Sequence, residues 1–274
     1  MLSVYFTVPA MASEVEVYDT EGLINALDNI QEGDTINVKG HTYLIDDDTL
    51  IKISKPCTIN FYDVYLRQWN GESDSQFHIA TDSLIEVNAH NVTLNFWDST
   101  FSTEKYDEAY VNERGSAIHV DGDNCVIDGH GSTNFVWCKT NAKYGGAIYI
   151  DDGYENCQIR GCNFAYCTAA EYGGAIFAAS DGCVITDCRF IGCKANGVDS
   201  FVYGEEVGQT KLVNCTDFDG NPCNASNCPG CVFVNASGFT LSEGNMAIIV
   251  GAACLVVGAF GGFLIGTKKK KTAA

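Results

Sequence analysis

Two aspartates follow short apolar segments of nearly identical sequence. Asp121 comes directly after AIHV, Asp151 comes directly after AIYI, and Asp152 is adjacent to Asp151. If the two segments stack, the carboxylates lie close together. Such a cluster is suited to binding Ca²⁺ or to serving as the acid–base pair of a glycosidase. The simpler interpretation, which we favour, is that these aspartates cap turns.

Cysteines form a second set of reactive side chains. Three of them recur after 26 residues, which gives the pairs Cys157–Cys183, Cys162–Cys188 and Cys167–Cys193. Adjacent strands lie about 4.8 Å apart, within the Cα separation that a disulfide permits. The pairs are therefore candidate disulfides, and the alternative is that each cysteine fills the core as a small apolar residue. No spacing matches a paired zinc site, so we expect no metal at these cysteines.

A separate cysteine group lies near the C-terminal end. It consists of Cys215, Cys223, Cys228 and Cys231. The last two form a CPGC motif, a redox spacing that here lacks a thioredoxin-like context. We expect two disulfides in this segment, with a zinc knuckle and redox chemistry as the alternatives.

Aromatic residues occupy outward positions of the same apolar segments. Those expected on the outer face are Tyr149, Phe177 and Tyr203, with Tyr144 and Tyr172 nearby. Stacked rings on an exposed face suit the binding of sugar rings or of a partner surface, unless loops cover them. The five histidines are scattered along the chain and predict no common site.

The elements that position these side chains follow from an internal repeat. Two strand-like segments alternate between residues 46 and 220, and their β-branched and aromatic bias is typical of strands. Stacking in register predicts one core column of Ile59, Leu94, Ile127, Ile159, Ile185 and Leu212. It predicts a second column of Ile51, Ile85, Ile118, Ile148, Ile176 and Val202. We therefore predict an all-β parallel β-helix solenoid of about six coils.

Residues 13–45 are expected to cover the N-terminal end of this solenoid. The segment from Thr20 to Glu32 has apolar residues on one helical face, with Thr20 as N-cap and Gly33 as the terminator. A strand over residues 34–38 and a hairpin-like segment over residues 39–45 would lead into the first coil.

Charge and hydropathy predict the location of the protein. Asp and Glu number 35 against 16 Lys and Arg, which argues against a nucleic-acid partner. Residues 246–266 carry no charge and are long enough for a transmembrane helix. Lys268–Lys271 follow it and place the tail, residues 267–274, in the cytoplasm. Residues 1–12 end in an A-x-A pattern and are expected to be a signal peptide.

This orientation has consequences for the flanking segments. Residues 221–245 become a cysteine-rich juxtamembrane segment. Gly258, Gly262 and Gly266 repeat every four residues, which favours a homodimer through the membrane helix. The candidate glycosylation sites of an exported chain are Asn91, Asn214, Asn224 and Asn235.

Short motifs in the repeat resemble known families. GGAI at 145–148 and 173–176, GSAI at 115–118 and FDGN at 218–221 resemble the GGA[ILV] and FxxN motifs of polymorphic outer-membrane proteins. The helix, the segment GDTINVKGHTYLI and the single membrane helix are similar to archaeal adhesin-like proteins of the pectate-lyase-like superfamily. The resemblance implies a right-handed β-helix and a role in surface adhesion. FxxN occurs once, cysteine replaces its asparagine in the other copies, and no outer-membrane barrel follows.

The predicted protein is a non-catalytic, single-pass membrane protein with an extracellular β-helix. It would bind a carbohydrate or a cell-surface protein and need no cofactor, with Ca²⁺ as the one candidate cation. The first alternative is a polysaccharide lyase or glycoside hydrolase that uses Asp121, Asp151 and Asp152. A lyase of this fold also needs a basic residue near its metal, and Arg160 and Arg189 do not occupy equivalent positions. The second alternative is a structural spacer of the cell envelope.

Overall fold

The computed structural model describes residues 12–45, 50–68, 83–105, 108–109, 115–205, 208–234 and 240–241. These residues are mostly β-structure, in two long sheets that are almost entirely parallel. The first sheet consists of β1 (Glu14–Val17), β2 (Thr35–Ile45), β4 (Thr58–Gln68), β6 (Thr93–Trp97), β7 (Thr100–Ser102), β11 (Val126–Val136), β13 (Gln158–Ala165), β16 (Val184–Thr186), β17 (Arg189–Ile191), β21 (Lys211–Val213), β22 (Thr216–Asp217), β23 (Val232–Val234) and β24 (Thr240–Leu241). The second sheet consists of β3 (Ile51–Ile53), β5 (Ile85–Val87), β10 (Ile118–Val120), β12 (Ile148–Ile150), β15 (Ile176–Ala178) and β20 (Val202–Gly204).

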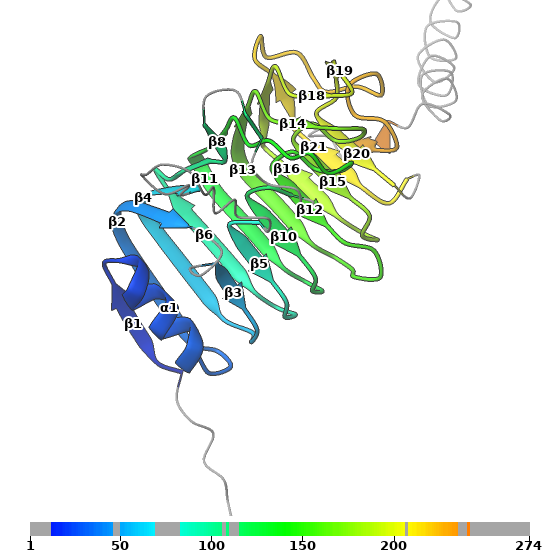
Figure 1. The fold of residues 1–274 in the computed structure, drawn as a ribbon. Helices are drawn as coiled ribbons and strands as arrows, with labels where there is room; N and C mark the ends of the chain where they lie inside the picture. The colour runs from blue at the N-terminus through cyan, green and yellow to red at the C-terminus, as the bar shows by residue number, and fades with distance from the viewer. Residues whose placement is uncertain are drawn as a thin grey trace, which may run out of the picture.

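The chain alternates between the two sheets. In the second sheet, each strand pairs in parallel with the strand from the previous visit, so that β3, β5, β10, β12 and β15 lie side by side in chain order (Figure 1). Two small sheets lie beside them, formed by β14 (Thr168–Ala169), β18 (Lys194–Ala195) and β19 (Val198–Asp199), and by β8 (Glu104–Lys105) and β9 (Glu108–Ala109). This arrangement is compatible with the predicted parallel β-helix.

Both predicted core columns are confirmed by the strand register. In the first sheet Ile59 is opposite Leu94, and the column continues through Ile127, Ile159 and Ile185 to Leu212. In the second sheet the column from Ile51 to Val202 is likewise in register. All these side chains are buried. Burial of each is worth roughly 1.5–3 kcal/mol, so the columns are a major source of stability.

Phenylalanines form a further buried column between the sheets. Its members are Phe61, Phe96, Phe101, Phe135, Phe164, Phe190 and Phe201. Neighbouring ring centroids lie 4.5–5.3 Å apart, and most of the rings are nearly parallel. Where the rings come from paired strands, as in Phe61–Phe96, Phe101–Phe135, Phe135–Phe164 and Phe164–Phe190, the spacing follows the strand separation.

Asp residues in the left-handed conformation bend the first sheet at equivalent places. The φ angle is 54° at Asp63, 50° at Asp98 and 54° at Asp187. Asp tolerates this conformation better than most residues because its short side chain can bond locally. The bends break the strands at Asp98, between β6 and β7, and at Asp187, between β16 and β17.

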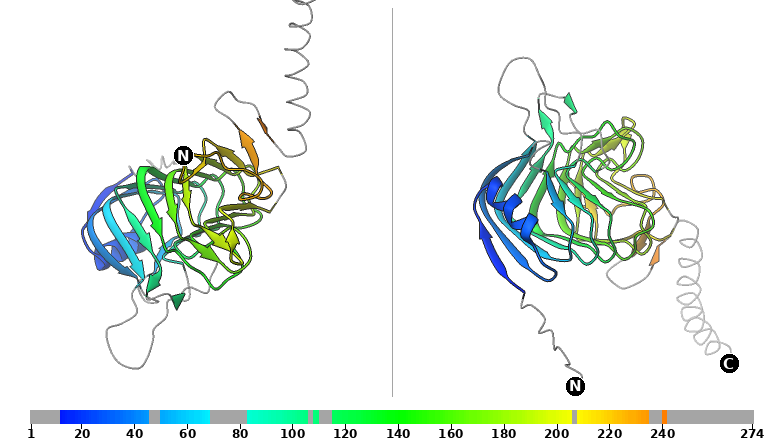
Figure 2. Two further views of the ribbon diagram at one scale, coloured as in Figure 1. Left: turned by 90° about the horizontal axis from the view of Figure 1, so that it is seen from above. Right: turned by 60° about the horizontal axis from the view of Figure 1, so that its bottom comes forward.

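The N-terminal helix differs in detail from its prediction. α1 (Thr20–Asn29) begins one residue earlier than expected, because the Asp19 carboxylate, rather than the Thr20 side chain, caps it by accepting from the Gly22 amide at 2.7 Å. It ends at Asn29 because Ile30 turns away with a ψ angle of 142°. Leu23 and Leu27 are buried, and α1 packs against β1, β2 and β3 at the N-terminal end of the stack (Figure 2).

The expected hairpin over residues 39–45 is wrong. These residues continue β2, which pairs in parallel with β4 along its whole length, and His41 is opposite Val64. A hairpin would have left the edge of β4 without this partner.

Several predicted features lie outside the described residues. They are almost all of the signal peptide of residues 1–12, Asn235, the membrane segment 246–266 with Gly258, Gly262 and Gly266, and the tail 267–274. Within the part of the chain that the structure describes, no helix has the length and apolarity needed to cross a membrane.

Candidate functional site

The second sheet brings one histidine and two aspartates together on its outer face. His119 lies on β10, between the inward-facing Ile118 and Val120. Asp121 follows two residues later, on the same face, because side chains alternate along a strand. Asp151 directly follows β12, the neighbouring parallel strand, where Tyr149 is the residue opposite His119.

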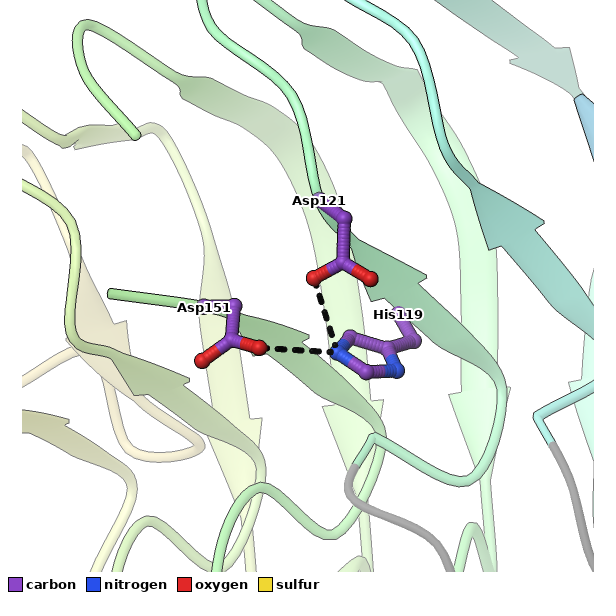
Figure 3. A group of neighbouring side chains, drawn as sticks. All are labelled: His119, Asp121 and Asp151. Atoms are coloured by element: carbon purple, nitrogen blue, oxygen red, sulfur yellow. Dashed lines mark ion pairs between the residues drawn. The ribbon is translucent and has the colours of Figure 1, made fainter. Parts of the chain in front are cut away.

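The three side chains converge on the imidazole Nε2 atom of His119. It lies 3.2 Å from Asp121 Oδ1 and 3.7 Å from Asp151 Oδ2. Figure 3 shows the imidazole nitrogen facing both carboxylates, with one carboxylate from each strand end. One donor atom from each residue lies within 4.8 Å of the other two. The cluster is therefore a three-donor group of one nitrogen and two oxygens.

Asp151 is held in place by its other oxygen. Asp151 Oδ1 accepts a hydrogen bond from the Tyr149 hydroxyl at 2.8 Å and one from the Asp152 backbone amide at 2.8 Å. Burial acts to raise the pKa of Asp151, but these hydrogen bonds and His119 outweigh it and hold the pKa below its ordinary value. Asp151 is therefore a fixed, ionised carboxylate.

Asp121 has the opposite electrostatic environment. Burial raises its pKa, His119 opposes this effect, and the negative charge of Asp151 adds to it. Asp121 Oδ1 and His119 Nε2 are buried atoms, and neither has a hydrogen-bond partner among the described residues. The two atoms are close to each other but are not aligned for a hydrogen bond.

The sequence analysis identified part of this cluster. It predicted that Asp121 and Asp151 lie close together, and they do. Asp152 does not join them: its side chain is exposed, and its backbone amide alone contacts the site. The interpretation of the histidines as scattered was wrong for His119. The sequence pattern that indicates the role of His119 is H-x-D at residues 119–121, which occupies the same place in its repeat as Y-x-D at residues 149–151.

The predicted aromatic row exists, but its centre is not exposed. Tyr149 and Phe177 are 3% and 1% exposed, and with Ala179 they form a small apolar cluster outside the main core. Tyr144 and Tyr203 pack against this cluster and are half-buried. Tyr172 is 40% exposed. The rings cover one another because the tyrosines that precede the GGAI motifs fold over the strands.

Two other aromatic residues that the sequence analysis did not single out are half exposed. Trp137 and Tyr166 are 52% and 51% exposed, with ring centroids 6.4 Å apart. Both have a left-handed backbone, with φ angles of 51° and 55°. Such angles are strained for bulky residues and often occur at functional positions. The signal is the W/Y-C dipeptide, which recurs in consecutive repeats.

The paired cysteines lie in adjacent coils, as predicted, but as thiols. None of the thirteen cysteines among the described residues forms a disulfide, and all thirteen are buried. Cys188 is a neighbour of Cys162, and Cys193 is a neighbour of Cys167. Cys157 interacts with Cys125 in the same way and lies near Cys183. Of the two alternatives that the spacing left open, the free thiols agree with cysteines that fill the core.

The four cysteines of the second group are neighbours: Cys231 lies close to the other three, and the Cys223 amide donates to the Cys215 carbonyl at 3.0 Å. Cys215 extends the column of Cys162 and Cys188, whereas Cys223 and Cys228 are neighbours in the following segment. The pKa of the Cys231 thiol is raised, mainly because the side chain is buried. Buried thiols with raised pKa values are poor nucleophiles, which argues against redox chemistry at the CPGC motif.

The other candidate residues are distributed over the surface. Asn91, Asn214 and Asn224 are exposed, as a glycosylation acceptor must be. Arg160 lies on the first sheet, where its Nε atom contacts Asp128 Oδ2 at 2.6 Å. It is therefore engaged by another carboxylate rather than by the aspartates of the candidate site.

The cluster of His119, Asp121 and Asp151 can perform two kinds of chemistry. It can coordinate a cation through one nitrogen and two oxygens, or it can transfer protons through a carboxylate pair. Compared with models of known protein families and with curated proteins, the chain matches none of them.

Proposed function

We propose that this protein is a surface-anchored adhesin-like β-helix whose extracellular part binds a carbohydrate or a cell-surface protein without catalysis. The proposed architecture is a right-handed parallel β-helix of about six coils, with α1 as its N-terminal cap. A C-terminal membrane helix would hold it in the cell membrane. The acidic composition of the chain suits an exposed, soluble surface.

The observation that carries the proposal is a row of three tyrosines from successive coils. Tyr144 and Tyr172 lie 5.9 Å apart between ring centroids, and Tyr172 and Tyr203 lie 4.6 Å apart. The buried Phe177 supports the row from beneath, at 4.5 Å from Tyr144 and 5.3 Å from Tyr203. A rigid, partly exposed row of phenol rings offers apolar area and hydroxyl groups together, which suits sugar or protein ligands.

Binding of the full-length protein to a glycan array and to intact cells tests the proposal. Tyr172→Ala is expected to lower affinity at least about fivefold, because truncating a central tyrosine removes more than about 1 kcal/mol of binding free energy. Tyr65→Ala is the matched control, since Tyr65 is 37% exposed, close to the 40% of Tyr172, and lies on β4 of the first sheet, outside the row. Equal losses of affinity in both variants would show that the row of tyrosines is not the binding surface. Absence of all binding would favour the structural spacer.

The second candidate is a polysaccharide lyase or glycoside hydrolase. The close approach of Asp121 and Asp151 favours it, because glycosidases use two carboxylates in one site. Release of reducing or unsaturated sugar ends from acidic polysaccharides would support an enzyme if Asp151→Asn abolished it. An unchanged release in this variant would assign the activity to a contaminant.

A further inference from the structure

Two buried polar atoms face each other without a hydrogen bond, and the ion pair between them requires a protonated His119. His119 Nε2 and Asp121 Oδ1 are 3.2 Å apart, are shielded from solvent, and make no hydrogen bond among the described residues. Buried side-chain nitrogens and oxygens are nearly always satisfied. Two unsatisfied atoms that converge with a third polar atom, Asp151 Oδ2, indicate a site for a species that contacts all three.

The spacing of the donor atoms fits a small metal ion. Zinc binds imidazole nitrogen and carboxylate oxygen at about 2.0–2.2 Å, so tetrahedral neighbours are roughly 3.3 Å apart. The two distances from His119 Nε2, 3.2 Å to Asp121 and 3.7 Å to Asp151, bracket this value. Small side-chain adjustments are therefore enough to place an ion between the three donors.

The orientation of Asp151 is fixed by contacts outside the three donors. The Tyr149 hydroxyl and the Asp152 amide both bond to Oδ1, which leaves Oδ2 directed at His119. Tyr149 also holds the histidine, because its ring contacts the imidazole edge-to-face with centroids 5.1 Å apart. Supporting contacts of this kind orient the ligands of metal sites. One residue, Tyr149, thus positions two of the three donors.

We propose that His119, Asp121 and Asp151 bind a first-row divalent transition-metal ion such as Zn²⁺. Imidazole together with carboxylate suits this class, whereas Ca²⁺ takes six to eight oxygen ligands. The structure thereby favours a different cation from the Ca²⁺ expected from the aspartates alone, because His119 supplies a nitrogen. Three protein ligands leave one tetrahedral position for water or for a ligand group. The site stands independently of the proposed adhesion function.

Titration of the chelator-treated full-length protein with Co²⁺, and then with Zn²⁺ in competition, tests the site. One equivalent of Co²⁺ is expected to give visible ligand-field absorption without the near-ultraviolet band of thiolate ligation, and Zn²⁺ should displace it. His119→Ala and Asp151→Asn are expected to weaken binding at least tenfold. Tyr149→Phe should weaken it by about tenfold, as loss of a supporting contact does.

His90→Ala is the matched control. His90 Nδ1 lies 3.0 Å from Asp123 Oδ2, so this variant removes another histidine–aspartate pair, one without a third ligand in the same cluster. It should bind the metal as the parent does. Equal thermal melting of the His119→Ala variant and the parent in the presence of chelator would show that the fold is intact.

Three results would overturn the proposal. A thiolate band lost in Cys228→Ser would place the metal on the cysteines. If Ca²⁺ displaced Co²⁺ with the same affinity as Zn²⁺, the cluster would be a site for hard cations instead. Metal binding that is unchanged in His119→Ala, or absent from the parent, would exclude the cluster.

Discussion

At the scale of single residues, Asp34 joins segments that are separate in the sequence. Its carboxylate accepts hydrogen bonds from the Ser13 amide at 2.7 Å and from the Gln31 amide at 2.8 Å. The side chain is buried, and these bonds lower the pKa of Asp34. The carboxylate thus connects the start of β1 to the end of α1, a role that no periodicity in the sequence reveals.

Asp34→Asn is expected to destabilise the protein at neutral pH, because one amide oxygen cannot replace two carboxylate oxygens. The folded pKa is lowered, so the stabilisation is complete above the unfolded pKa of about 3.9 and is lost as the pH falls through the folded value. Urea unfolding of both proteins between pH 3 and pH 7 measures this. The stability gap should be constant near neutrality and shrink below about pH 4. A gap that grows on acidification would contradict the assignment.

At the scale of elements, the GGAI motif sets the close approach of successive coils. The first glycine requires a left-handed backbone, with a φ angle of 62° at Gly145 and at Gly173. The second glycine leaves room for the next coil, because a Cβ atom on Gly146 would overlap the Gly174 carbonyl oxygen. In the earlier GSAI copy, the Ser116 hydroxyl donates a hydrogen bond to the Gly146 carbonyl.

Gly146→Ala is therefore expected to cost more than about 3 kcal/mol of stability, since neither backbone can move without breaking the ladder. Gly153→Ala is the matched control: Gly153 has a φ angle of 81°, and nothing lies within 4 Å of the added Cβ. Its cost should be roughly 1–2 kcal/mol, from the left-handed conformation alone. Chemical denaturation measures both variants. Gly146 is not left-handed, so a loss of stability in Gly146→Ala no larger than that of the control would contradict close contact between coils as its role.

At the scale of the whole molecule, the buried cysteines are distributed along the stack. They occupy the same kind of position as the core isoleucines, and Val92 and Thr210 take the place of cysteine in one column. Burial raises the pKa of Cys183, and it does the same for Cys193. Their reaction with a thiol reagent therefore requires opening of the coils around them.

Thiol labelling followed by mass spectrometry is expected to modify all fourteen cysteines of the chain in denaturant without reductant. The thirteen buried thiols should be protected in the native protein, because the thiolate is the reactive form and burial disfavours it. Fewer modified residues in denaturant would reveal disulfides between coils. Rapid labelling of the native protein would contradict the packing.

Much of the fold could be predicted because the repeat carries its own register. Equivalent isoleucines stack, so matching Ile59 to Leu94 in the sequence also matches them in the sheet. Local segments outside the repeat were harder to predict. The hairpin expected over residues 39–45 was wrong because pairing with β4 overrides the local turn preference of Gly40.

The sequence by itself determined which residues face the core, because side chains alternate along each strand and the repeat interval aligns equivalent residues of successive strands. It also determined that Asp121 and Asp151 follow equivalent strands. Only the tertiary structure decided that His119 completes their cluster and that the outer aromatic rings cover one another. Both depend on side-chain contacts between adjacent coils and their loops, at distances that the order of residues along the chain does not specify.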